Sequence, residues 1–123
     1  MLQLSPLIKD ISWDDTLSML NGSHKGWHLP TLMQVLLIMK SHKAKEFCPD
    51  GYVWTLTNFD KSAFIVSFDG TYIKVSKRIE HIGINARFII GGMSDIHRWI
   101  DSVPTKRNTK RYSIFGFVLS LFH

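Results

Sequence analysis

The sequence predicts a mixed α+β fold in which two short helices pack on a small antiparallel sheet, followed by a helix and a strand near the C-terminus. Helix-start patterns occur in the first third of the chain, at residues 12–15 and 31–34. From residue 52 onward apolar and polar side chains alternate, and Asp69-Gly70 separates two alternating runs. The change from a helical to a strand period predicts the fold class.

The first predicted helix begins at Ser12, whose hydroxyl can cap free amides, with Asp15 three residues later. Four of its side chains share one face at helical spacing: Trp13, Thr16, Leu17 and Leu20. Asn21-Gly22 is typical of a helix end. We therefore expect a short amphipathic helix before Asn21.

The second predicted helix begins at Thr31, where Gln34 completes a Thr-x-x-Gln capping box. Residues 32–39 are apolar almost all round, which is typical of a buried helix. Three lysines within residues 40–45 are favourable beside the negative end of this helix.

Residues 62–68 and 71–76 flank Asp69-Gly70 and predict a β-hairpin with a two-residue type I′ turn. Such a turn leaves Ile65 and Ser67 on the face opposite the core. The pairs expected on the core face are Phe68–Thr71, Val66–Ile73 and Phe64–Val75.

Two elements are expected after the hairpin. Residues 86–90 predict a short strand that ends at Gly91-Gly92. Residues 94–103 predict a helix capped by Ser94, with three apolar residues on one side: Ile96, Trp99 and Ile100.

The chain ends in a basic loop at residues 104–111 and an almost wholly apolar run at residues 114–122. The apolar run is too short to span a bilayer. We expect it to be a final strand buried in the sheet, and the alternative is an interaction tail.

Size and composition favour a single domain over residues 1–123, because 123 residues with 45% hydrophobic side chains can bury a real core. Residues 1–10 lack an apolar run of signal-peptide length. Cys48 is the single cysteine, so an intrachain disulfide cannot form, which fits a reducing compartment. We therefore expect a cytoplasmic protein.

The net charge of +5 is concentrated in the second part of the chain. Residues 1–73 carry six Lys and Arg against seven Asp and Glu, whereas residues 74–123 carry nine against three. The candidate binding residues form one basic run with an aromatic neighbour: Lys106, Arg107, Lys110, Arg111 and Tyr112. Such a run could meet an acidic protein face or a phosphate backbone, and the alternative is a solvated loop.

Several of these pieces together resemble the C-terminal domain family of collagen-like bacterial surface proteins, which has a C-type-lectin-like fold. They are a tryptophan that opens the first helix, Gly-Trp-His-Leu-Pro-Thr at residues 26–31, Trp54-Thr55 in a strand, and Phe68-Asp69-Gly70 at the hairpin. The resemblance covers roughly residues 13–90. Residues 91–123 are then an extension particular to this chain.

The resemblance implies a binding scaffold and locates no binding site. The retained scaffold residues are Trp13, Gly26, Trp27, Pro30, Thr31, Trp54, Asp69 and Gly70. His28 and Gln34 stand where the family has Arg and Glu. The run Arg87-Phe88-Ile89 lacks the cysteine of the family's closing strand.

No complete metal or catalytic site is predicted, and we expect no cofactor. His24 and His28 are four residues apart, but the glycines and Pro30 around them argue against a helix that presents both to one ion. Calcium-dependent sugar binding is disfavoured, because Cys48-Pro49-Asp50 lies in the wrong element for it. Cys48 is expected to be a small buried or loop thiol and not a nucleophile.

The sequence therefore favours a non-enzymatic binding module. We expect a small intracellular accessory protein of a phage or mobile element that binds and inhibits a host macromolecular complex, such as a CRISPR effector. The charge of +5 argues against DNA mimicry and favours docking on an acidic protein face or on a nucleic-acid-bound complex. Two alternatives stay open: extracellular adhesion to glycan or collagen-like ligands, and direct contact with nucleic acid through the basic loop.

Overall fold

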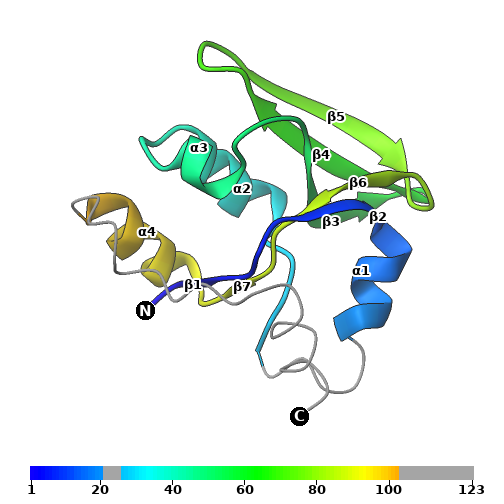
Figure 1. The fold of residues 1–123 in the computed structure, drawn as a ribbon, viewed down its shortest axis with the longest axis horizontal. Coiled ribbons are helices and arrows are strands. Elements are labelled where there is room, and N and C mark those ends of the chain that lie inside the picture. The colour runs from blue at the N-terminus through cyan, green and yellow to red at the C-terminus, as the bar shows by residue number, and fades with distance from the viewer. Residues whose placement is uncertain (21–25, 103–123) are drawn as a thin grey trace.

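A computed structural model describes residues 1–20 and 26–102, which contain four helices and seven strands (Figure 1). The helices are α1 (Trp13–Leu20), α2 (Leu32–Met39), α3 (Ala44–Phe47) and α4 (Met93–Asp101). The strands are β1 (Gln3–Leu4), β2 (Ile8–Ser12), β3 (Val53–Phe59), β4 (Ser62–Phe68), β5 (Ile73–Ile79), β6 (Gly83–Ala86) and β7 (Ile89–Ile90). The predicted helix end at Asn21-Gly22 and the predicted strand at residues 114–122 lie outside the described residues.

Five strands form one sheet in the order β2-β6-β3-β4-β5, and β1 pairs with β7 in a separate ladder. Neighbouring strands of the sheet are antiparallel except β3 and β6, which pair in parallel through Val53 and Asn85. The α+β class is confirmed, although the sheet is mixed and not purely antiparallel. Neither β1 nor β2 was predicted, because each is short and pairs with a strand far along the chain.

Both predicted helix starts are confirmed by side-chain caps. The Ser12 hydroxyl accepts from the Asp15 N–H at 3.1 Å. The Thr31 hydroxyl accepts from the Gln34 N–H at 3.2 Å, and the Gln34 side chain accepts from the Thr31 N–H at 2.9 Å. The expectation of an all-round buried second helix is wrong in one respect, because Met33 is 67% exposed.

Two groups of buried side chains cover the two faces of β4. Val66 belongs to a cluster with residues of α2, α3 and α4. Ala63 and Ile65 belong to a second cluster that contains three tryptophans: Trp13, Trp27 and Trp54. Ile65 is fully buried, so the prediction that it lies opposite the core is wrong. A strand between two cores has no exposed face.

The indole groups also tie the N-terminal segment to β3. Trp13 Nε1 donates to the Thr55 carbonyl at 2.9 Å, and Trp54 Nε1 donates to the Ile11 carbonyl at 2.7 Å. The hydrogen bonds of Trp13 and Trp54 each give a buried indole N–H the partner that it requires. Trp54 is fully buried, and Trp27 is 3% exposed.

The β4–β5 hairpin differs from the prediction. Phe68 pairs with Ile73, so the loop has four residues and the register is shifted by two. The Asp69 carboxylate accepts from the backbone N–H groups of Thr71 and Tyr72, each at 2.8 Å. These bonds satisfy the amides of the longer loop, which is why it replaces the two-residue turn.

A two-residue turn occurs instead between β3 and β4. Asp60 and Lys61 have φ angles of 50° and 62°, and Phe59 pairs with Ser62 across them. Positive φ at both central positions is the mark of a type I′ turn. Neither turn residue is glycine, so the usual hairpin signal is missing from the sequence.

Arg87 interrupts the strand predicted at residues 86–90 and divides it into β6 and β7. Its guanidinium donates to three main-chain carbonyls, those of Phe47 at 2.9 Å, Ser5 at 2.7 Å and Glu46 at 3.2 Å. A cation is favourable beside the last carbonyls of a helix. One side chain therefore joins α3 to the segment between β1 and β2.

The predicted late helix is α4, but Ser94 does not cap it. α4 begins at Met93, and the Asp95 carboxylate accepts from the Gly92 N–H at 3.0 Å. The carboxylate reaches back to the chain before the helix, as a capping side chain does. The predicted apolar side is confirmed by three buried or half-buried residues: Ile96, Trp99 and Ile100.

We predict that Trp54→Ala lowers the free energy of unfolding by roughly 3–5 kcal/mol, because it leaves a large cavity between the sheet and the N-terminal segment. Trp54→Phe should cost less, since it loses the bond to the Ile11 carbonyl but keeps most of the ring. Chemical denaturation followed by circular dichroism measures both. The control is Met33→Ala on the exposed side of α2, which should unfold almost as wild type does; wild-type stability of Trp54→Ala would contradict this role.

We also predict that Gly70→Val destabilises the hairpin. Gly70 has a φ of +98°, a conformation that costs an L-residue about 1–2 kcal/mol. The melting temperature of Gly70→Val should therefore fall, whereas Thr71→Ala in the same loop should change it little. Equal melting temperatures for the two variants would show that the loop does not require glycine.

Candidate binding surface

β5 is an edge strand that the rest of the fold leaves exposed. It pairs with β4 along its whole length, from Ser62–Ile79 to Phe68–Ile73, without a register shift. No other strand of the described chain pairs with its outer side. Residues 74–79 are all exposed. β5 lies at the top of Figure 1, at the outer edge of the sheet.

The backbone of β5 directs every second N–H and C=O away from β4. At the two ends of the pairing, the Asp69 N–H donates to the Tyr72 carbonyl at 3.3 Å and the Glu80 N–H donates to the Lys61 carbonyl at 3.2 Å. Along an antiparallel strand, residues that bond to the neighbour alternate with residues that do not. The residues whose main-chain groups point outward are therefore Ile73, Val75, Lys77 and Ile79.

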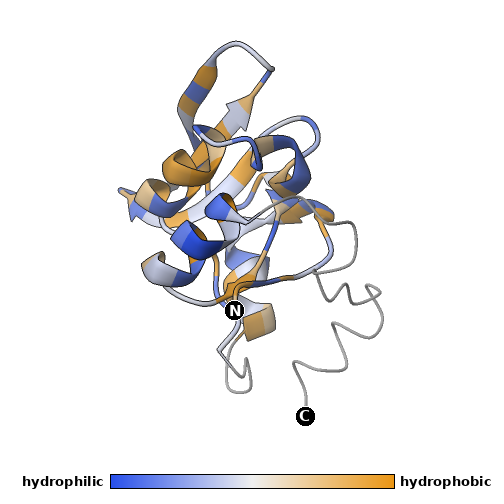
Figure 2. Ribbon diagram, turned by 90° about the vertical axis from the view of Figure 1, so that its left-hand side faces the viewer, coloured by the Kyte–Doolittle hydropathy of each residue, from blue (hydrophilic) through white to orange (hydrophobic). Residues whose placement is uncertain are grey.

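The two faces of β5 differ in chemistry, and Figure 2 shows hydrophobic and hydrophilic positions alternating along the hairpin. One face carries Lys74, Ser76 and Arg78, and the other carries Ile73, Val75, Lys77 and Ile79. Val75 and Ile79 are 47% and 49% exposed. Phe59 lies in the same row as Ile79, and the Lys77 ammonium is 5.6 Å from the centre of its ring.

β5 is strongly basic for its length. It carries three cations, Lys74, Lys77 and Arg78, and no carboxylate. The Asp69 carboxylate lies 3.7 Å from the Lys74 ammonium, and both side chains are about half exposed. An exposed ion pair of this kind contributes little to stability, so it competes weakly with a ligand's carboxylates.

The opposite edge of the sheet is irregular. The pairing of β2 with β6 shifts register between Ile8 and Ile11, and Asp10 has a φ of 56°. This bulge lies against Gly83, where any Cβ would collide with the Asp10 carboxylate. Bulges blunt a sheet edge against further pairing. β5 is therefore the regular edge of the sheet.

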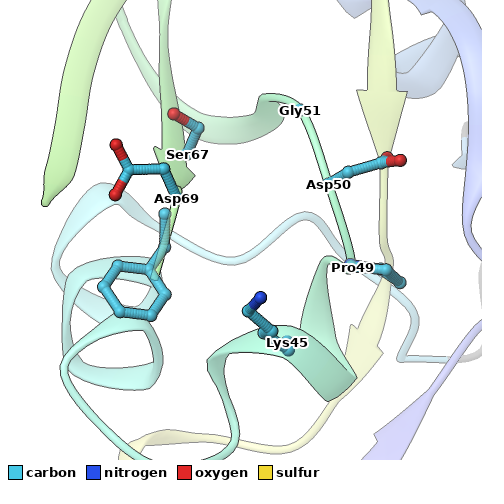
Figure 3. Close-up of a pocket in the computed structure, with 7 residues that line it drawn as sticks. Lys45, Pro49, Asp50, Gly51, Ser67 and Asp69 are labelled. Atoms are coloured by element: carbon cyan, nitrogen blue, oxygen red, sulfur yellow. The ribbon is translucent and has the colours of Figure 1, made fainter. Parts of the chain in front are cut away.

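A pocket of about 320 Å³ opens beside the hairpin loop (Figure 3). Its lining residues are Lys45, Pro49, Asp50, Gly51, Ser67, Phe68 and Asp69. The Lys45 side chain points from α3 toward the space between the hairpin and the opposite loop, whereas the Asp50 carboxylate points away from it. The side chains of Lys45, Ser67 and Asp69 therefore provide polar groups for contacts next to β5.

Cys48 is buried, as predicted, with 3% of its surface exposed. Burial raises the pKa of its thiol, and the charge of Arg87 opposes this shift without overcoming it. The thiol donates to the Asp50 carbonyl at 3.2 Å. A buried thiol that stays protonated is a poor nucleophile.

Both ring nitrogens of His28 lie within hydrogen-bond distance of main-chain carbonyls. Its Nδ1 and Nε2 lie 3.0 and 3.1 Å from the carbonyls of Leu29 and Gly91. Within residues 1–20 and 26–102, no three His, Cys, Asp or Glu side chains converge to hold a metal ion. His24, the other histidine considered from the sequence, lies outside these ranges.

The binding residues expected from the sequence lie outside the described residues: Lys106, Arg107, Lys110, Arg111 and Tyr112. The scaffold residues lie within the fold. Gly26 has a φ of +88°, the Pro30 carbonyl accepts from the Leu56 N–H at 2.8 Å, and Thr31 caps α2. Gly26, Pro30 and Thr31 shape the backbone and form no part of the β5 surface, whereas Asp69 and Gly70 lie in the loop that leads into β5.

The β5 surface was not singled out from the sequence. A signal for it exists, since polar or charged residues alternate with Ile73, Val75 and Ile79, broken only at Lys77, and no carboxylate lies within residues 73–79. That alternation identifies a strand with two unlike faces, but only the strand order shows that this strand lies at an edge.

Comparison with protein-family models, curated proteins and solved structures gave no match. In the part of the chain that is described, no helix is long and apolar enough to cross a membrane.

We predict that Asp69 makes the stability of the protein depend on acid pH. The N–H groups of Tyr72 and Thr71 hold the pKa of this carboxyl below its ordinary value of 3.8. A lowered folded-state pKa gives stabilisation that is present above that ordinary value and is lost as the pH falls through the folded-state pKa.

Thermal unfolding of wild type and of Asp69→Asn between about pH 6 and pH 2 measures this effect. Asparagine keeps an acceptor oxygen without titrating, so the melting temperature of wild type should fall further at the acid end than that of the variant. An identical pH dependence for the two proteins would contradict the prediction.

Proposed function

We propose that this protein is a non-enzymatic binding module that docks through its β4–β5 hairpin on an acidic region of a macromolecular partner. The observation that carries the proposal is β5 itself, an exposed edge strand with three cations and no carboxylate. Electrostatic complementarity of this kind speeds association and selects partners of opposite charge. The exposed Val75 and Ile79 add apolar area to the same surface.

The proposal includes a C-type-lectin-like frame for the part of the chain around residues 13–90. Three features support it: the helices α1, α2 and α3 precede the main hairpin, the early strands β1 and β2 pair with the late strands β7 and β6, and the motif tryptophans lie in the core. Such frames present loops and hairpins to ligands while the core keeps its shape.

The biological setting that we propose is a cytoplasmic accessory protein of a phage or mobile element, acting on a host complex such as a CRISPR effector. It is supported by the charge of +5 and the single buried Cys48. A basic docking surface suits an acidic subunit of such a complex.

Direct nucleic-acid contact is the second candidate, because exposed aromatic rings lie near the cations. Tyr72 is 69% and Phe59 is 65% exposed, and rings of this kind stack bases while cations bind phosphates. We favour a protein partner because β5 exposes the aliphatic side chains of Val75 and Ile79 among its cations, and a phosphate backbone does not complement them.

The test is affinity capture from host lysate with the full chain and a charge-reversal variant, Lys74→Glu with Arg78→Glu. The control reverses two exposed lysines elsewhere, Lys9→Glu with Lys40→Glu, and so has the same net charge. Quantitative mass spectrometry should find an acidic protein that wild type and the control retain and that the hairpin variant loses.

Equal retention by the hairpin variant and the control would overturn the proposal. Capture that disappears after nuclease treatment and falls steeply with salt would instead support nucleic acid as the ligand. The same assay applied to the combined alanine variant of the basic segment, Lys106, Arg107, Lys110 and Arg111, should show a smaller loss than charge reversal on β5.

A further inference from the structure

We infer that β5 binds an extended acidic segment of the partner, which adds to the sheet as a sixth strand. This inference rests on the proposed function and specifies how the docking occurs. In β-strand addition the main-chain hydrogen bonds supply affinity, and the side chains at alternate positions supply specificity.

The backbone geometry of β5 suits an added strand. Its outward N–H and C=O groups belong to Ile73, Val75, Lys77 and Ile79, and the register with β4 is continuous over all seven residues. No strand of the described chain covers these groups. The bulged β2 edge lacks this regularity.

The side chains of β5 specify the sequence of the added strand. Residues of the ligand opposite Lys74, Ser76 and Arg78 lie on the charged face, so acidic side chains fit there. Residues opposite Val75 and Ile79 lie on the face that also exposes Phe59, so apolar side chains fit there. Lys77 lies between these two residues, but its ammonium is 5.6 Å from the centre of the Phe59 ring. The complementary segment therefore alternates acidic and apolar residues.

A second copy of this chain fits the edge poorly. A two-fold axis through Ser76 would place Lys74 opposite Arg78 of the other copy, and like charges directly opposite each other are destabilising. Lysines on an edge strand commonly prevent such self-pairing. The apolar run at residues 114–122 contains no carboxylate, so it would leave the cations of β5 without a counter-charge. The charges thus favour an acidic partner over a second copy of this chain and over residues 114–122.

The test uses the full chain and three synthetic peptides. The first alternates glutamate with valine, the second has the same composition with all glutamates in one block, and the third alternates lysine with valine. Titrations followed by backbone amide NMR signals should show binding of the first peptide, with shifts centred on β5. The block and lysine peptides should bind at least about tenfold more weakly, because they lack the alternating charge pairs.

Proline substitution separates edge pairing from charge attraction. Val75→Pro removes an outward N–H, which an edge strand tolerates, so the variant should fold but lose the alternating peptide. Val75→Thr is the matched control and should keep binding. Lys74→Glu with Arg78→Glu should reverse the preference toward the alternating lysine peptide.

Hydrogen exchange in the free protein checks that the edge is open. The amides of Val75 and Lys77 should exchange faster than those of Ser76 and Arg78, which face β4. Slow exchange at Val75 and Lys77 would overturn the inference, since it would mean that a second copy or another segment of this chain already covers the edge.

Equal affinity of the block and alternating peptides, or binding by Val75→Pro as tight as by wild type, would also overturn strand addition. The affinity capture from lysate then separates the two proposals. If Lys74→Glu with Arg78→Glu fails to retain the partner there, the proposed function stands and only the docking mode is wrong. Unchanged capture by that variant would instead overturn the proposed function itself.

Discussion

The two indole hydrogen bonds between the N-terminal segment and β3 are the constraint on which the rest of the structure depends. Trp13 reaches the carbonyl of Thr55, and Trp54 reaches that of Ile11. β2 and β3 are not hydrogen-bonded neighbours, because β6 lies between them. Trp54 therefore bridges two strands that the ladder does not join, and Trp13 joins the start of α1 to the same strand, β3. Together they fix the central strand on which β4 and β5 are built.

This arrangement separates the residues that maintain the fold from those that meet a ligand. β4 is enclosed by a core on each face, so its side chains contribute mainly to stability. β5 is hydrogen-bonded to β4 along its whole length, but few of the β5 side chains are buried. The sequence of β5 is therefore constrained mainly by strand propensity and charge. A surface of this kind can change partner specificity with little change in the free energy of unfolding.

The parts of the fold that could be predicted from the sequence depend on local interactions. The caps at Ser12 and Thr31 involve residues three positions apart, so their patterns are visible directly. The hairpin register depends on how the Asp69 carboxylate bonds to loop amides, which a dipeptide rule does not describe. The edge position of β5 depends on strand order, a long-range property, so the candidate surface could not be located before the structure.

The burial of Cys48 makes the folded chain unreactive toward thiol reagents. It is the one cysteine in the sequence, it is 3% exposed, and its raised pKa leaves little thiolate. A maleimide dye should therefore attach to the native thiol only when the surrounding segment opens, and the labelling rate then reports that local opening. A cysteine placed on the hairpin would be labelled selectively in the folded protein, which gives a site-specific fluorophore without removing the native residue.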